Sequence, residues 1–275
     1  MPSSRISPVR QAAATASENS DSEKYLEENT VQRYRDRIWK TLERVGRPDS
    51  RFHWDFSSFI ADFDGSDRAT RLVTELDAWR SAERVFITPD NSTELLRREA
   101  MRAGKLLIVT TYGIRRGFLA LYPADVPADE VSYAATLDGL DRYARPVTLA
   151  ELRGGPVLPL MITGGSAVSR NGIRFGKGHG YFDLEWAMLS EIGLTDAQTV
   201  VVDVVHDEQF VDDHLDGEPH DVPVDWIVTN LRAIEVPNPG RTPGRVRWDL
   251  IPGTEHEFLP PIVELRDVRS AVDAE

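Results

Sequence analysis

One stretch decides how this chain folds and what it binds: residues 170–186 read RNGIRFGKGHGYFDLEW. Gly176, Gly178 and Gly180 stand at alternate positions and leave a loop without bulky side chains. The backbone N–H groups of such a loop can close around phosphate oxygens, as they do at a helix N-terminus. We therefore expect an anion to bind this loop, and a nucleotide suits it best.

Three charged side chains accompany the glycines. Arg174 and Lys177 place positive charge beside the loop, and Asp183 supplies a hard carboxylate of the kind that magnesium prefers. Simpler interpretations stay open: a tight strand-to-helix turn, a surface ion pair for Arg174, a solvated charge for Lys177, and a helix cap for Asp183. The joint placement of these residues favours a phosphate site.

The composition restricts the classes of function. The chain has 275 residues, a net charge of −13 and no cysteine. Its acidic balance argues against sequence-independent nucleic-acid binding, which needs basic surfaces, and the lack of cysteine excludes disulfides and thiol catalysis. No apolar run approaches the roughly 20 residues that span a membrane. We expect a cytoplasmic monomer or homodimer without nucleic-acid or membrane partners, acting on a small molecule.

The chain divides into a tail and one domain. Residues 1–28 are mostly polar, without the apolar centre of a secretory signal, and predict a flexible tail. Residues 29–275 contain neither an internal repeat nor a clear linker, and predict a single α/β domain.

Helical and strand patterns alternate through the first half of this domain. Apolar residues at three- and four-residue spacing predict helices over 30–45 and 67–79. A β-branched run predicts a strand over 83–88. Asn91 with Glu94 has the spacing of a capping box, which predicts a helix that Gly104 ends.

The alternation continues after that helix. Strands are predicted over 105–110, 156–162, 199–205 and 226–229, with a helix from Tyr181 to Gly193. After Pro237, frequent proline and glycine predict an extended tail with a short strand over 245–248. Such alternation indicates a three-layer α/β fold, a mostly parallel central sheet with helices on both faces. Ligands bind such sheets at the carboxyl ends of the strands, where the glycine loop is expected.

Three ordered motifs carry a family resemblance. Residues 176–183 (GKGHGYFD) resemble the signature Arg-Leu-Gly-x-Gly-x-Gly-Tyr-Tyr-Asp of 5-formyltetrahydrofolate cyclo-ligases, also called methenyltetrahydrofolate synthetases. Residues 206–209 (HDEQ) resemble a glutamine-bearing segment of that family. Residues 220–229 (HDVPVDWIVT) resemble its His-Asp-x-Pro-x-Asp-x-x-x-Thr segment. The resemblance covers about 31–268 and is nearest to a divergent branch, because Asp183-Leu184-Glu185 replaces the usual Asp-Arg.

The resemblance implies a cyclo-ligase fold of the NagB/RpiA/CoA-transferase-like type and a reaction that needs ATP and Mg²⁺. ATP would phosphorylate the formyl oxygen at folate N5 and leave ADP. The N10 amine would then attack the activated carbon, and loss of phosphate would give 5,10-methenyltetrahydrofolate. The implied catalytic residues are Arg174, Lys177 and Asp183, with Asp183 also the metal ligand. The implied nucleotide-binding residues are Arg35, Arg174, Gly176, Lys177, Gly178, His179, Gly180, Tyr181 and Asp225. The implied substrate-binding residues are Trp54, Asp90, Tyr181 and Gln209.

Two departures from the family keep other functions open. Val31 stands where the family's first helix has a lysine, and Asp90 stands where it has a longer glutamate that holds the pterin. One alternative is therefore an enzyme that uses the same ATP activation to join a non-folate acyl or formyl compound to an amine. The other is a non-catalytic nucleotide-binding module.

Overall fold

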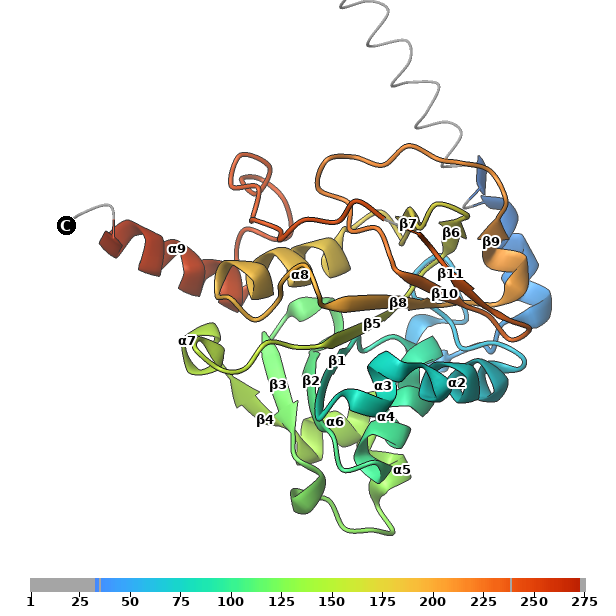
Figure 1. Cartoon of the computed structure of the whole chain (residues 1–275), viewed down its shortest axis with the longest axis horizontal. Helices are drawn as coiled ribbons and strands as arrows, with labels where there is room; N and C mark the ends of the chain where they lie inside the picture. The colour runs from blue at the N-terminus through green and yellow to red at the C-terminus, as the bar shows by residue number, and fades with distance from the viewer. Residues whose placement is uncertain (1–32, 35, 238, 273–275) are drawn as a thin grey trace, which may run out of the picture.

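The computed structural model describes residues 33–34, 36–237 and 239–272. An eight-stranded sheet in the order β11-β10-β8-β5-β1-β2-β3-β4 forms its centre (Figure 1). The five inner strands are parallel: β1 Arg84–Ile87, β2 Leu106–Thr110, β5 Leu160–Gly164, β8 Val200–Val204 and β10 Trp226–Val228. The three outer strands are antiparallel to their neighbours: β3 Phe118–Leu121, β4 Arg145–Val147 and β11 Ala233–Glu235.

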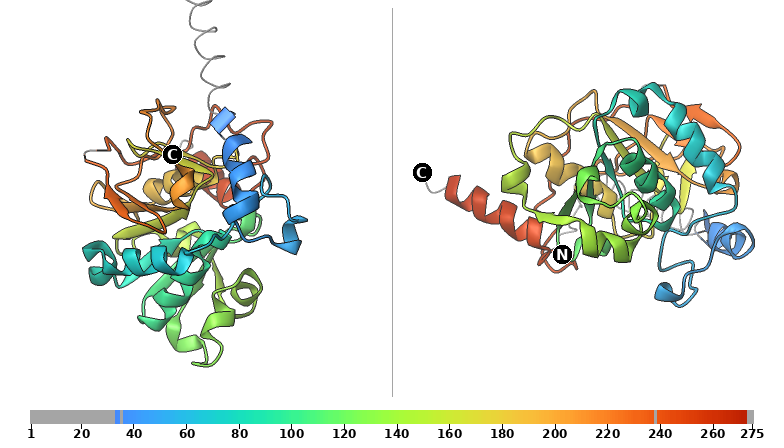
Figure 2. Two further views of the ribbon diagram at one scale, coloured as in Figure 1. Left: turned by 90° about the vertical axis from the view of Figure 1, so that its right-hand side faces the viewer. Right: turned by 90° about the horizontal axis from the view of Figure 1, so that it is seen from below.

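Helices cover both faces of this sheet, as Figures 1 and 2 show. One face carries α2 Ser66–Glu75, α3 Asp77–Ser81, α4 Glu94–Arg102, α5 Val131–Ala134 and α6 Leu137–Tyr143. The other carries α7 Leu149–Leu152, α8 Tyr181–Glu191 and α9 Pro260–Val272. In β1, Val85 and Ile87 pack toward the first group and Phe86 toward the second, because successive strand residues point to opposite faces. The predicted three-layer, mostly parallel fold is confirmed.

A second, three-stranded sheet stands beside the main one. It consists of β6 Ala167–Ser169, β7 Arg174–Phe175 and β9 Phe210–Val211. The first helix, at residues 33–34 and 36–45, packs on it through Ile38, Leu42 and Val45. The segment just before the glycine loop therefore contains a hairpin, in which Gly172 turns the chain with φ +82°.

Several element predictions are corrected. The helix over 67–79 is two helices, because Leu76 is extended (φ −65°, ψ 141°). Asn91 does not cap a helix: it begins a 3₁₀ turn, and its side-chain amide donates to Asp49 at 2.8 Å. The tail after Pro237 ends in α9, and residues 245–248 form no strand. The other 3₁₀ turns are Ser50–Phe52, Tyr112–Ile114, Pro123–Asp125 and Asp207–Gln209.

The order of the parallel strands fixes where a ligand can bind. From β1 the chain moves to β2 on one side, and later to β5, β8 and β10 on the other. The order therefore reverses between β1 and β5, and crevices in open α/β sheets lie beyond the carboxyl ends of strands at such a reversal. Among the described helices, none has the length and apolar character needed to cross a membrane. The predicted tail, residues 1–28, lies outside the described residues.

Candidate active site

The glycine loop connects β7 to α8. Gly178 and Gly180 have φ of +102° and +62°, a region that side chains with a Cβ rarely enter. Gly180, not Asp183, is the N-cap of α8, and the N-cap makes no side-chain hydrogen bond to the first turn. The alternative in which Asp183 caps the helix is therefore wrong. The N–H groups of the first turn, which lack partners within the helix, face the loop.

Arg174 and Asp183 form the charged pair of the site. The guanidinium Nη2 of Arg174 lies 3.1 Å from Asp183 Oδ1, which also accepts the N–H of Val222 at 3.0 Å. The guanidinium lies over the ring of Phe182, 4.7 Å from its centroid. Burial by itself would lower the pKa of Arg174, but the negative charges of Asp183 and other nearby carboxylates outweigh it and raise that pKa. Arg174 is thus a buried, permanent cation, and the surface ion pair is excluded.

Lys177 points away from this pair, toward the carboxyl ends of β1 and β2. Its ammonium donates to Tyr112 Oη at 2.6 Å and to the carbonyl of Ser58 at 3.0 Å. It also lies 4.7 Å from the centroid of the Tyr112 ring. Burial lowers the pKa of Lys177, and the charge of Asp90 opposes that shift. Lys177 therefore places its positive charge near the carboxyl ends of the strands where the strand order reverses, between β1 and β5, rather than at the N-terminus of α8.

Asp90 follows β1 at the same place. Burial raises its pKa, and the hydroxyl of Thr88, which donates to its Oδ2 at 2.6 Å, opposes the rise. Aromatic rings lie near it on the Tyr112 side: Phe52 is stacked on Phe59 at 4.7 Å and tilted against Tyr112 at 4.8 Å. This arrangement offers a flat apolar surface next to a carboxylate and an ammonium.

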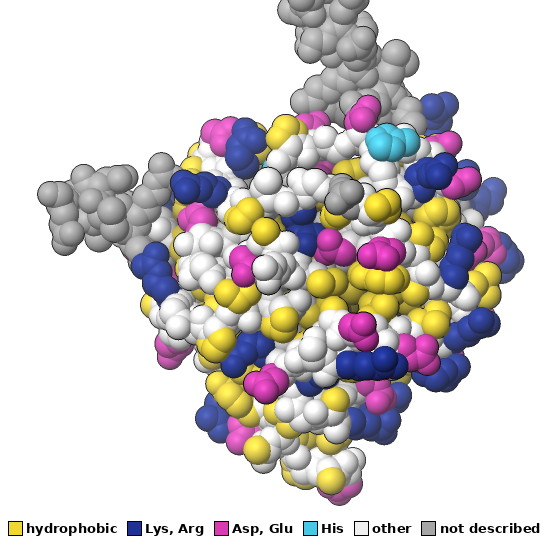
Figure 3. All heavy atoms as spheres, in the orientation of Figure 1, with side chains coloured by type: hydrophobic (Ala, Val, Ile, Leu, Met, Phe, Trp, Pro, Cys, Tyr) yellow, Lys and Arg dark blue, Asp and Glu magenta, His cyan; other side chains and the backbone are white. Residues whose placement is uncertain are grey.

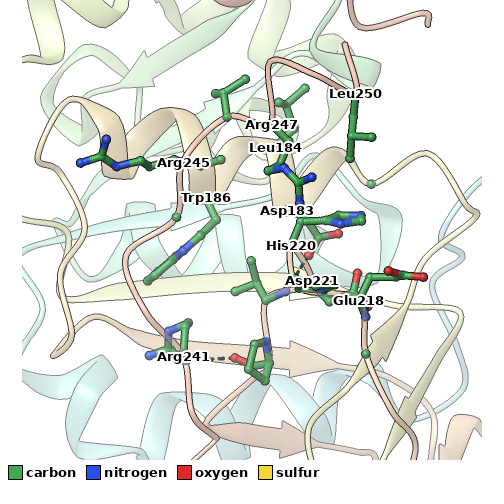
Figure 4. A pocket seen from close by; sticks show the side chains of 18 of the residues that line it. Asp183, Leu184, Trp186, Glu218, His220, Asp221, Arg241, Arg245, Arg247 and Leu250 are labelled. Carbon is green, nitrogen blue, oxygen red and sulfur yellow. Dashed lines mark hydrogen bonds between the residues drawn. The ribbon is translucent and has the colours of Figure 1, made fainter. Parts of the chain in front are cut away.

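A cavity of about 650 Å³ opens on the other side of the glycine loop (Figure 4). The loop and the start of α8 form one wall, residues 217–223 a second, and residues 240–251 a third. Asp183, His220 and Asp221 project into the same region, and the arginines at 241, 245 and 247 come from the third wall. This volume lies within the range of small-molecule and cofactor sites.

Two predicted residues of the loop are held by one acid. The phenol of Tyr181 donates to Glu255 Oε2 at 3.0 Å, and the imidazole of His179 pairs with the other oxygen of Glu255. The two rings stack with centroids 5.4 Å apart. Glu255 thus fixes the outer side of the loop.

The remaining predicted residues have other surroundings. Asp225 accepts the N–H of Val201 at 2.6 Å and pairs with Arg241 at 2.8 Å, so its carboxylate braces the cavity wall. The Gln209 amide donates to the carbonyls of Gly165 and Ser166, at 2.9 and 3.0 Å, and is buried. Trp54 is 62% exposed. The predicted nucleotide-binding Arg35 lies outside the described residues.

Two buried acids beneath the loop were not predicted. Glu185, on α8, accepts the hydroxyl of Thr110, and burial raises its pKa to about 8. Asp203, in β8, is fully buried, and neither of its oxygens has a hydrogen-bond partner among the described residues. Burial raises its pKa to about 7 against the attraction of Arg174. The only sequence signal for Asp203 was one acid inside an otherwise all-valine strand.

Comparisons with known proteins show which family this chain is similar to. The 5-formyltetrahydrofolate cyclo-ligase family model matches residues 27–230. The Methenyltetrahydrofolate synthase domain-containing protein of Homo sapiens is 32% identical over 239 residues, which cover 86% of this chain and 61% of that protein. Its namesake from Danio rerio is 29% identical over 235 residues, 84% of this chain and 60% of that protein.

A solved structure is also similar in part. The NMR structure of Aquifex aeolicus 5,10-methenyltetrahydrofolate synthetase aligns with a TM-score of 0.46 and 17% identity, covering 79% of this chain and 98% of that one. The chain belongs to the 5-formyltetrahydrofolate cyclo-ligase family. It spans about three fifths of the length of the curated relatives that it matches.

Proposed function

We propose that this protein is an ATP- and magnesium-dependent ligase that forms a C–N bond by converting 5-formyltetrahydrofolate to 5,10-methenyltetrahydrofolate. One observation carries the proposal: the glycine loop has a possible binding site on each side. On one side lies the N-terminus of α8, which no side chain caps, beside Asp183. On the other side the ammonium of Lys177 lies near the carboxyl ends of the strands where the strand order reverses. Nucleotide and acceptor would meet across that loop. Family membership supports the same type of reaction.

The nucleotide side has suitable donors and room. The N–H groups at the start of α8, together with Gly178 and Gly180, suit phosphate oxygens, and the adjoining cavity of about 650 Å³ can take the rest of a nucleotide. The described residues hold no group of three or more His, Asp or Glu placed for a metal. Magnesium is usually held by one or two carboxylates with substrate phosphates, so Asp183 suffices as its protein ligand. When bound, it would neutralise phosphate charge.

The acceptor side suits a flat ring that carries a carbonyl. Phe52 and Tyr112 provide the apolar surface, with the buried Phe59 stacked against Phe52, and Asp90 can accept hydrogen bonds from ring N–H groups. Lys177 would stabilise negative charge on the activated oxygen, because a fixed cation in a site that excludes water acts strongly on developing charge. Lys177 is largely removed from water by burial, so water screens its charge less and its attraction for a negative oxygen is stronger.

A non-folate acceptor is the second candidate, and Asp90 favours it. The carboxylate is already engaged by Thr88 and sits on a shorter side chain than the family's glutamate, so a ring must approach β1 more closely to reach it. Trp54, which the sequence analysis assigned to the substrate, is 62% exposed. In this case ATP would activate a formyl or acyl compound other than the folate, and an amine would attack the activated carbon.

One assay series tests these possibilities. Purified protein is incubated with ATP, Mg²⁺ and 5-formyltetrahydrofolate, and methenyltetrahydrofolate is followed by its absorbance. We expect product from the wild type, and we expect Lys177→Ala and Asp183→Ala each to reduce its rate of formation by about 100-fold or more. Arg71→Ala, which removes an exposed ion pair with Asp67, serves as the control and should keep full activity.

The other outcomes separate the alternatives. Nucleotide binding without folate turnover, but with ADP release on another acyl donor and amine, would establish the second candidate. Tight binding without turnover on any pair would leave a non-catalytic nucleotide-binding module. Failure to bind nucleotide in calorimetry would refute the proposal.

A further inference from the structure

Four polar atoms near the end of β5 lack partners although they are buried. They are both carboxylate oxygens of Asp203, the Nε of Arg174 and the hydroxyl of Ser92, among the described residues. A buried polar group without a hydrogen bond is costly, and such groups concentrate where function requires them. Asp203 is 0% exposed and Arg174 is 9% exposed, so water cannot readily satisfy either.

Gly165 lies between the side chains of Asp203 and Arg174 and, because it has no Cβ, leaves the space between them open. A Cβ at Gly165 would stand 2.9 Å from Asp203 Oδ2 and 3.2 Å from Arg174 Cγ. The glycine therefore leaves the space between the acid and the arginine open. Arg174 meanwhile uses its Nη2 on Asp183. One arginine thus lies between two carboxylates, one paired and one unpaired.

We propose that Asp203 is the alternate partner of Arg174, which moves from Asp183 to Asp203 when Asp183 binds a magnesium ion. This inference rests in part on the proposed function, because it assigns the metal to Asp183. A guanidinium left at 3.1 Å from a metal ligand would repel the metal. A buried arginine without any carboxylate would be equally costly. Asp203 resolves both problems, and it acts as a positioning residue that touches neither substrate nor metal.

The charges around Asp203 agree with such an exchange. Arg174 of β7 and Asp90 after β1 are the charged groups that act on it: the arginine favours its ionised form and Asp90 disfavours it. With Arg174 engaged elsewhere, burial raises the pKa of Asp203 to about 7. Direct pairing with Arg174 would lower that pKa again, and the acid would release its proton as the exchange occurs.

A double-mutant cycle tests the exchange without any ligand. Urea unfolding is measured for the wild type, Asp183→Asn, Asp203→Asn and the double variant. In the wild type, Asp203→Asn removes an unpaired acid and should leave stability unchanged or higher. In Asp183→Asn, Arg174 depends on Asp203, so Asp203→Asn should lower the folding equilibrium constant by about tenfold more than it does in the wild type.

A matched cycle controls for charge at a distance. Asp221 also raises the pKa of Arg174, but its Oδ2 already accepts the N–H of Glu218 at 2.8 Å. Asp221→Asn should therefore couple to Asp183→Asn much more weakly than Asp203→Asn does. Equal coupling in the two cycles, or none in the first, overturns the inference.

A second measurement covers variants that fold poorly. Binding of ATP with Mg²⁺ is followed by calorimetry at pH 7 in buffers of different ionisation enthalpy. The wild type should release about half a proton more than Asp203→Asn on binding, because the acid is half protonated beforehand. Equal proton release with normal binding refutes the exchange alone. Absence of binding in the wild type refutes the proposed function, and the cycle then decides the exchange.

Discussion

Glu185 offers the sharpest test of the electrostatics beneath the glycine loop. Its side chain is buried at 2% exposure on α8, with the hydroxyl of Thr110 as its partner. Burial raises its pKa from 4.5 to about 8, so the folded protein keeps this proton at pH values where the unfolded chain has released it. Stability therefore falls as the pH rises through that interval. We consider the variant Glu185→Gln, which keeps the shape and stays neutral.

The size of the effect follows from the shift. Each pH unit within the interval costs the wild type about 1.4 kcal/mol, since one more proton is bound when folded than when unfolded. Between pH 5.5 and 7.5, Glu185→Gln should gain about 2.7 kcal/mol of stability relative to the wild type. Above pH 8 the gain should level off at about 5 kcal/mol, an upper value because the site can relax on ionisation.

Urea unfolding at a series of pH values measures this gain, with the buried Trp186 as a fluorescence probe. Glu75→Gln, at an exposed position of α2, controls for the change in net charge. Curves of stability against pH that run parallel for Glu185→Gln and the wild type would refute the reasoning. Burial would then not hold a proton on Glu185.

Three further variants test the site. Gly180→Ala places a Cβ at φ +62° and should cost about 1–2 kcal/mol, seen as a lower melting temperature; an unchanged value would show that the loop adapts. Arg241→Ala leaves the Asp225 carboxylate without its partner at 2.8 Å and should cost about 3 kcal/mol in urea unfolding, whereas a loss below 1 kcal/mol would contradict a structural role. Lys177→Ala should lower kcat/KM for the acceptor by about 100-fold or more while nucleotide affinity in calorimetry changes little. The opposite pattern would place Lys177 on the phosphates.

Much of the fold could be predicted because its signals are local. The valine run of β8 and the apolar residues of α8 are local patterns that the chain carries whatever its partners. Gly178 and Gly180 likewise marked the loop, and the structure adds that both have positive φ. The pattern failed where tertiary contacts decide: Asn91 bonds to Asp49 across 42 positions instead of capping, and α9 forms after a segment rich in proline and glycine.

The candidate site also contains features that the sequence predicted and features that only the structure revealed. Sequence spacing predicted that Arg174, Lys177 and Asp183 would share a loop with the glycines, but not that Lys177 would turn to Tyr112, 65 positions away. The family resemblance assigned Asp225 to the nucleotide, and only the structure shows that this carboxylate pairs with Arg241. The direction of a long side chain depends on which partner the fold brings within reach, and spacing along the chain holds no such information.

The sequence by itself determined the α/β class, the glycine loop and the family, since each depends on residue types at fixed short spacing. Only the tertiary structure decided that Glu185 and Asp203 lie beneath that loop as buried acids. Glu185 comes from α8 and Asp203 from β8, and their charge states follow from the water that packing removes around them. Burial is a property of the assembled layers, so no local pattern could have revealed it.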